Sequence, residues 1–81
     1  QHYAPRASVV LVDRCPDDPP ADSAFIGLEA PRHGERLALV RVHANARDYA
    51  HALFEFMREA DARGLERIFA QRVAGAGVEL A

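Results

Sequence analysis

The sequence predicts a single, small, three-layer α/β domain with a mostly parallel sheet of about four strands. Three short apolar segments precede one long amphipathic segment, and a fourth short apolar segment follows it after a tight turn. A strand, a helix and a strand joined in this way form a βαβ unit, in which the two strands run parallel. The length of 81 residues allows one domain with a thin core. The predicted order of elements is β-β-β-α-β, followed by the start of a further helix.

Three segments in the first half of the chain have the composition of strands. Residues 8–13 are rich in β-branched side chains and lead into residues 15–20, where prolines allow neither helix nor strand. Residues 23–29 form the second predicted strand and residues 35–43 the third. The third contains the apolar run LALV, as expected of a strand that is covered on both faces. None of the three alternates strictly between apolar and polar residues, which favours a sheet flanked on both sides.

Residues 45–63 are predicted to form the helix. Asn45 is a suitable N-cap, and Asp48 stands where the acidic residue of a capping box is found. Gly64 supplies the left-handed residue that commonly ends a helix. At about 100° per residue, the apolar side chains fall within an arc of roughly 160°, which predicts one buried face. They are Ala46, Tyr49, Ala50, Leu53, Phe54, Phe56, Met57 and Ala60.

The end of the chain contains one more strand and the start of a second helix. Residues 65–69, with the sequence LERIF, are predicted to form the fourth strand. Gly75-Ala76-Gly77 then makes a turn, and residues 78–81 have the composition of the first turn of a helix. The glycines do not complete a dinucleotide fingerprint, because the third glycine position is Leu80. The chain has no initiator Met and ends where this segment starts, so we expect it to be a piece of a longer protein.

Composition excludes several classes of protein. The hydrophobic fraction of 49% and the charged fraction of 27% are typical of a soluble, folded domain. No apolar run is longer than four residues, so no segment is predicted to span a membrane. A single cysteine, Cys15, excludes an internal disulfide framework and favours a reducing compartment such as the cytoplasm. The net charge of −2 argues against direct binding of nucleic acid.

Neither a metal site nor a catalytic nucleophile is predicted. The four histidines lack the spacing of metal ligands, and they are His2, His33, His43 and His51. His51 is interpreted as a solvated histidine on the polar helix face. Cys15 is interpreted as an incidental loop cysteine, because its neighbours provide no base. The aspartates of the same loop, Asp17, Asp18 and Asp22, lack the spacing of a calcium-binding loop.

The first residues have an unusual composition for the edge of a domain. The run His2-Tyr3-Ala4-Pro5-Arg6 brings together an imidazole, a phenol and a guanidinium group. Such groups serve phosphate and base contacts. The alternative is a linker that packs its tyrosine onto the domain, and the residues alone leave both interpretations open.

Two motifs resemble a known family, the two-domain threonylcarbamoyl-AMP synthases. The run His2-Tyr3-Ala4-Pro5 is similar to the H-Y-x-P linker of these proteins. Their pattern Y-A-x-x-L-[YF]-x-x-[LM]-R-x-x-D-x-x-G-[VL]-[DE]-x-I is similar to the helix and fourth strand. The matching residues are Tyr49, Ala50, Leu53, Phe54, Met57, Arg58, Asp61, Gly64, Leu65, Glu66 and Ile68. Only the linker and this helix–strand segment are distinctive. By the resemblance, residues 1–7 end an interdomain linker and residues 8–81 form a small, Rossmann-like accessory domain.

The resemblance implies an enzyme context. Such synthases, which are nucleotidyltransferases, condense L-threonine, bicarbonate and ATP into threonylcarbamoyl-AMP for tRNA threonylcarbamoyladenosine modification. The family's YrdC-like domain holds ATP, with Mg, and is the partner expected in cis, while contact with the tRNA-modification machinery is indirect. The linker folds over that active site, so His2 and Tyr3 are implied as nucleotide-binding residues. This piece itself is expected to hold no cofactor or metal, to contain no catalytic residue and to gate the neighbouring active site.

Two other functions remain open from the sequence. One is a free-standing regulatory α/β domain that senses a small ligand at its strand ends. The other is a module that docks tRNA or a partner protein, which the negative net charge weakens.

Overall fold

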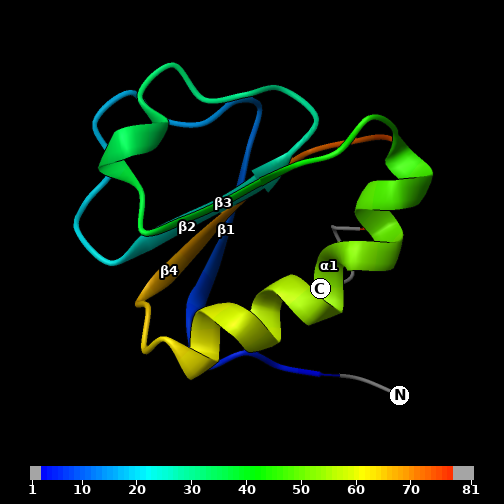
Figure 1. Ribbon diagram of the computed structural model, residues 1–81. Helices are drawn as coiled ribbons and strands as arrows, with labels where there is room; N and C mark the ends of the chain where they lie inside the picture. The colour runs from blue at the N-terminus through cyan, green and yellow to red at the C-terminus, as the bar shows by residue number, and fades with distance from the viewer. Residues whose placement is uncertain (1–2, 78–81) are drawn as a thin grey trace.

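The structure is a computed structural model that describes residues 3–77. One helix, α1 (Ala46–Ala62), crosses one face of a four-stranded sheet (Figure 1). The strands are β1 (Ser8–Val12), β2 (Ser23–Gly27), β3 (Leu39–Val42) and β4 (Arg67–Gln71). They lie in the order β1-β4-β2-β3, and every neighbouring pair is parallel. The predicted α/β class and parallel sheet are confirmed.

The two central strands carry most of the sheet's contribution to the core. All five residues of β2 are buried, and four of the five in β4 are buried as well. The edge strands β1 and β3 are half-exposed. As predicted, the strands that flank α1 run parallel, but β2 lies between them, so the connection through α1 passes over one strand.

The third strand is shorter than predicted. Glu35 and Arg36 belong to a 3₁₀ turn, η1 (Gly34–Arg36), and the strand begins only at Leu39. Its position at the edge of the sheet leaves Arg41 and Val42 exposed, so the expectation of a strand covered on both faces was wrong. The apolar run predicted the strand, but the sheet order determined how much of it is buried.

The local signals that predicted α1 are confirmed. The Oδ1 atom of Asn45 accepts a hydrogen bond from the backbone N–H of Asp48 at 2.9 Å, and Gly64 adopts φ +71° after the helix. Five side chains of α1 are buried against the sheet: Tyr49, Leu53, Phe56, Met57 and Ala60. Phe54, predicted to face the core, is instead exposed.

The two faces of the sheet are covered differently. On one face, α1 packs its apolar side chains against β2 and β3, in a core that also contains Ile68 and Ala70 of β4. On the other, Cys15, Phe25 and Phe69 form a smaller core with partly buried Val12, Leu37 and Val40. In residues 3–77 this third layer consists of loops and η1 instead of a second helix (Figure 1).

The last part of the described chain is a turn. Ala76 donates its backbone N–H to the carbonyl of Val73 at 3.1 Å, and Gly75 and Gly77 have positive φ, as a turn requires. The helix predicted for residues 78–81 lies outside the described residues. Within residues 3–77, no helix has the length and hydropathy needed to cross a membrane.

Candidate functional site

The N-terminal segment, residues 3–7, is held against the C-terminal half of α1 by the carboxylate of Asp61. The Tyr3 hydroxyl donates a hydrogen bond to Asp61. The backbone N–H groups of Arg6 and Ala7 also donate to this carboxylate, each at 3.1 Å. One side chain therefore collects three donors from a segment more than fifty positions away in the sequence.

The sheet brings this segment to the helix. Ser8, the first residue of β1, donates its N–H to the carbonyl of Glu66 at 2.9 Å, which aligns β1 with β4 immediately after the turn that ends α1. The segment before β1 must therefore pass the last turn of the helix, where Asp61 lies. Pro5 has no N–H, and the two residues after it, Arg6 and Ala7, supply the backbone donors.

At neutral pH, Tyr3 and Asp61 are in the protonation states that their hydrogen bond requires. The hydrogen bond to Asp61 is the main cause that raises the pKa of Tyr3 above its ordinary value, so the phenol keeps the proton that it donates. The same hydrogen bond, supported by the N–H groups of Arg6 and Ala7, lowers the pKa of Asp61. The carboxylate therefore remains ionised and accepts all three bonds.

Arg58 adds a second contact to the tyrosine. Its guanidinium carbon lies 5.6 Å from the centroid of the Tyr3 ring, within the range of a cation–π interaction. Arg58 and Asp61 are three residues apart on one helix, so both contact Tyr3 from the same flank of α1. The tyrosine is thus held by its hydroxyl and by its ring.

A second cluster of hydrogen bonds, centred on the side chain of Gln71, closes the carboxyl end of the sheet. Open α/β sheets commonly bind ligands at this end. The side-chain Oε1 of Gln71 accepts hydrogen bonds from the N–H groups of Leu28, at 2.8 Å, and Glu29, at 3.2 Å. Its Nε2 donates to the carbonyl of Asp13 at 3.0 Å and to the carboxylate of Glu29 at 2.9 Å. The ends of β1, β2 and β4 are therefore tied together by the protein's own amide, where the sensor interpretation expects a ligand.

Gly27 permits this arrangement. A Cβ atom at this position would lie 2.5 Å from Oε1 of Gln71 and 2.7 Å from Cζ of Phe25. Any larger residue would have to displace the amide from the strand ends.

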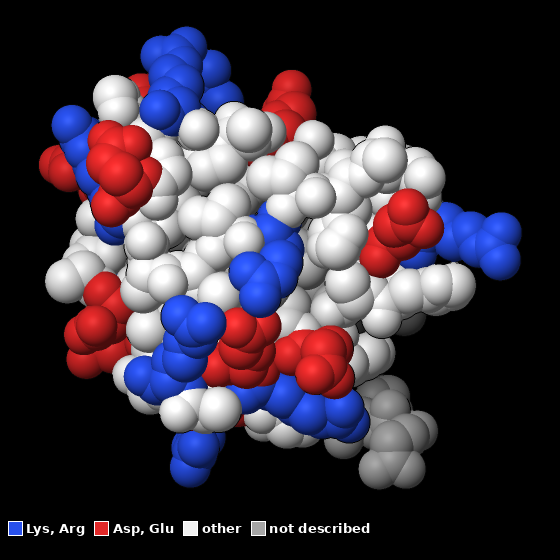
Figure 2. All heavy atoms as spheres, viewed as in Figure 1, with Lys and Arg blue, Asp and Glu red and all other residues white. Residues whose placement is uncertain are grey.

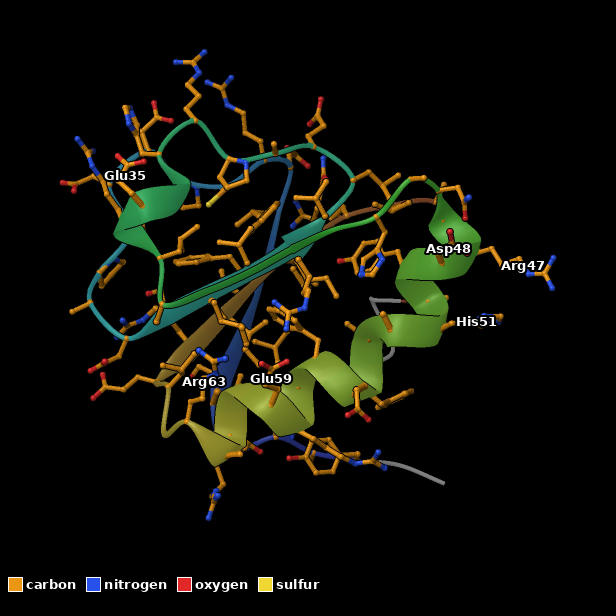
Figure 3. All side chains as sticks on the ribbon, in the orientation of Figure 1. Glu35, Arg47, Asp48, His51, Glu59 and Arg63 are labelled. Carbon is orange, nitrogen blue, oxygen red and sulfur yellow. The ribbon has the colours of Figure 1, made fainter. Side chains whose placement is uncertain are left out.

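A groove of about 390 Å³ lies between β3 and α1. Its residues are Arg41, His43, Asp48, His51, Ala52, Glu55, Phe56 and Glu59. The charges at one end pair with each other, because Glu59 accepts from Arg41 of β3 and from Arg63, both at 3.0 Å. Figure 3 labels Glu59 and Arg63 at this end of α1. The ring of His43 stacks on Tyr49, with an interplanar angle of 8°. Figure 2 shows acidic and basic side chains interspersed on this face, without a large patch of one sign.

The cysteine and the histidines that the sequence offers as candidate site residues form no reactive or metal-binding cluster in residues 3–77. Cys15 is buried against Phe25 and Phe69, and burial raises the pKa of its thiol, which does not suit a nucleophile. His51 is exposed on α1, as predicted. Among residues 3–77 no three histidine, cysteine, aspartate or glutamate side chains cluster in a way that would hold a metal ion. Of the two implied nucleotide-binding residues, Tyr3 contacts Asp61 and His2 lies outside the described part of the chain.

Asp61 stands in the family motif, but no role is predicted for it from the sequence. A signal was available, because a negative charge in the last turn of a helix is disfavoured by the helix dipole. An aspartate in that position therefore needs donors from elsewhere, which here come from the N-terminal segment.

Comparison with known proteins agrees with the motifs. The family model described as threonylcarbamoyl-AMP synthase, C-terminal domain, matches residues 1–81. Neither the comparison with curated proteins nor the comparison with solved structures gave a match.

Proposed function

The chain belongs to the family of threonylcarbamoyl-AMP synthase C-terminal domains, and from that premise we propose that it positions an interdomain linker over the active site of the synthase. In this proposal residues 3–7 are the described end of the linker. The active site lies in a YrdC-like domain of the same protein, which binds ATP and Mg. That domain forms threonylcarbamoyl-AMP from ATP, L-threonine and bicarbonate in the cytoplasm, and the accessory domain itself performs no chemistry.

One observation carries the proposal, the collection of three linker donors by Asp61. A linker tied at this point moves with its domain, so the domain's position sets the position of the linker. The chemistry needs such control, because a mixed carbamate–phosphate anhydride is readily hydrolysed. A lid that excludes water until the product is handed on would preserve it.

The anchor restricts how the linker meets the nucleotide. We keep His2 and Tyr3 as the proposed nucleotide contacts. While the linker is anchored, the Tyr3 hydroxyl is committed to Asp61, so any contact of Tyr3 with the nucleotide would involve its ring.

The alternative functions have less support. Gln71 occupies the strand ends at which a ligand sensor would bind, and the charged residues at one end of the groove beside β3 pair with each other. A surface for docking tRNA is weakened by the interspersed charges and by the net charge of −2.

Asp61→Asn in the full synthase tests the proposal. The amide keeps the shape of the carboxylate but loses its charge and offers donors where acceptors are needed. We expect trypsin to cleave after Arg6 roughly tenfold faster, because the hydrogen bonds to a charged acceptor are lost. We also expect less threonylcarbamoyl-AMP per ATP consumed, because more of the anhydride reaches water before it is handed on.

Asp18→Asn is the matched control, since it removes the same charge from a side chain that is almost fully exposed in a loop. It should change neither cleavage nor yield. If Asp61→Asn released the linker but left the product yield unchanged, the anchor would exist and the lid function would be wrong.

A further inference from the structure

We propose that α1 carries a docking surface for the domain at the other end of the linker. The surface consists of Arg47, Phe54 and Arg58, here named the Arg47–Phe54–Arg58 strip. The inference rests on the proposed function, because it assumes that the linker joins this domain to a second one in the same chain.

Phe54 is the apolar centre of the strip. Within the described chain, the large hydrophobic residues that are exposed are Val10, Val42 and Phe54, at 39%, 44% and 41%. The two valines lie on edge strands and point to the loop-covered face of the sheet. Val9, next to Val10, and Leu39, three positions before Val42, pack on the helix side, and side chains alternate between the two faces along a strand. Phe54 alone lies on the helix layer.

Phe54 is also continuous with the anchored linker. It lies one turn before Arg58 on the same flank of α1, and Arg58 covers the ring of Tyr3. The exposed ring of Phe54 thus extends a contact that the linker already makes with α1. A domain tethered through Tyr3 is delivered to this flank at high effective concentration, so a small surface suffices to bind it.

The charges of the strip indicate the chemistry of the partner. Arg47 extends away from the molecule and forms no ion pair with any described residue (Figure 3). Arg58 pairs with Glu55 at 3.8 Å, and both side chains are largely exposed. The carboxylate of Asp61, on the same flank, is occupied by its three donors from residues 3–7. On the opposite flank, by contrast, Arg41 and Arg63 are both paired with Glu59.

The surface that fits the strip is an apolar pocket bordered by carboxylates. Arginine and aromatic side chains are the residue types most enriched at the energetic centres of protein interfaces. Two guanidinium groups around one phenylalanine favour a protein partner over tRNA, which would require a longer basic track. The occupant to which the inference commits is the catalytic domain in cis.

The experiment uses the full synthase, with small-angle X-ray scattering and trypsin cleavage after Arg6 as readouts. We expect Phe54→Ser to increase the radius of gyration and to speed cleavage by roughly tenfold, as loss of a central aromatic contact does. Arg47→Glu, which leaves the apolar contacts intact, should act in the same direction more weakly, with an effect that fades at high salt. Val42→Ser, equally exposed on the other face, is the control and should behave as the wild type.

Several results would overturn the inference. One is a wild-type synthase whose domains are already separated, and another is a Phe54→Ser variant with unchanged scattering and cleavage. A variant that lost affinity for tRNA without domain separation would instead make the strip a nucleic-acid surface. The docking surface can fail while Asp61→Asn still releases the linker, so its failure is distinguishable from failure of the proposed function.

Discussion

Two side chains, Gln71 and Asp61, each gather several hydrogen bonds from distant parts of the chain, but they do so in different surroundings. Gln71 is buried at the carboxyl end of the sheet and joins three strand ends through its amide. Asp61 is half-exposed in the last turn of α1 and holds residues that precede the first strand. The first cluster joins the strand ends, and the second joins α1 to the segment that precedes β1.

The difference teaches which contact can be broken without unfolding the domain. Removing a buried amide leaves donors and acceptors that water cannot reach, and each one is costly. Removing the Asp61 contact leaves the Tyr3 hydroxyl and the Arg6 N–H where water can solvate them, and only Ala7 is buried. We therefore expect Gln71 to act on the stability of the whole domain and Asp61 to act mainly on the position of residues 3–7.

Gln71→Leu should produce the largest effect. The leucine fills much of the volume but leaves the N–H groups of Leu28 and Glu29 without their acceptor. We expect the free energy of unfolding to fall by about 3 kcal/mol, measured by urea denaturation. Arg72→Leu is the neighbouring control, because it removes only an exposed ion pair with Asp13 at 3.1 Å and should cost about 0.5 kcal/mol. Equal costs for the two variants would invalidate the contrast.

Gly27→Ala should have the next largest effect. The added methyl group would meet both the Gln71 amide and the Phe25 ring at less than van der Waals distance, and overpacking of this kind costs about 2 kcal/mol. Gly34→Ala is the matched control, since its nearest neighbour would be Pro31 at 3.6 Å, an ordinary contact. In thermal unfolding, Gly27→Ala should have a clearly lower midpoint temperature than Gly34→Ala. If Gly27→Ala were as stable as Gly34→Ala, the strand ends would be looser than the Gln71 cluster implies.

The smallest effect concerns the pH range over which Asp61 holds residues 3–7. The anchored state requires protonated Tyr3 and ionised Asp61, whose ordinary pKa values are 10.0 and 3.8. Because folding raises the first pKa and lowers the second, the anchor contributes fully between those two values. It is lost as the pH falls through the lowered pKa of Asp61 or rises through the raised pKa of Tyr3.

Tyrosinate absorbance measures this directly. Tyr3 should ionise above pH 10.0, while burial raises the pKa of Tyr49 to about 12. In Tyr49→Phe, Tyr3 is the single tyrosine of the 81 residues, so its titration is read alone. Adding Asp61→Asn should return the Tyr3 pKa toward 10.0. An unchanged titration would mean that Asp61 does not hold the tyrosine in solution.

Features that depend on near neighbours in the chain were predictable. The N-cap of α1 links Asn45 to Asp48 three residues away, and Gly64 ends the helix through its own backbone conformation. The short apolar segments likewise predicted four strands and a parallel sheet. These features needed no knowledge of the rest of the molecule, because propensity, periodicity and capping act over a few residues.

The tertiary structure decided everything that depends on which segments become neighbours. The sheet order placed β3 at an edge and left Val42 exposed. The sheet covers only part of the apolar side of α1, so Phe54 is exposed to solvent. Asp61 meets Tyr3 across 58 positions, and Gln71 meets Leu28 across 43. Such contacts arise from the path of the whole chain, so no local pattern identifies the partner. The position of Asp61 in the last turn of α1 indicates only that it needs a donor. Both clusters of hydrogen bonds, and with them the candidate site, became visible only once the strands were ordered in space.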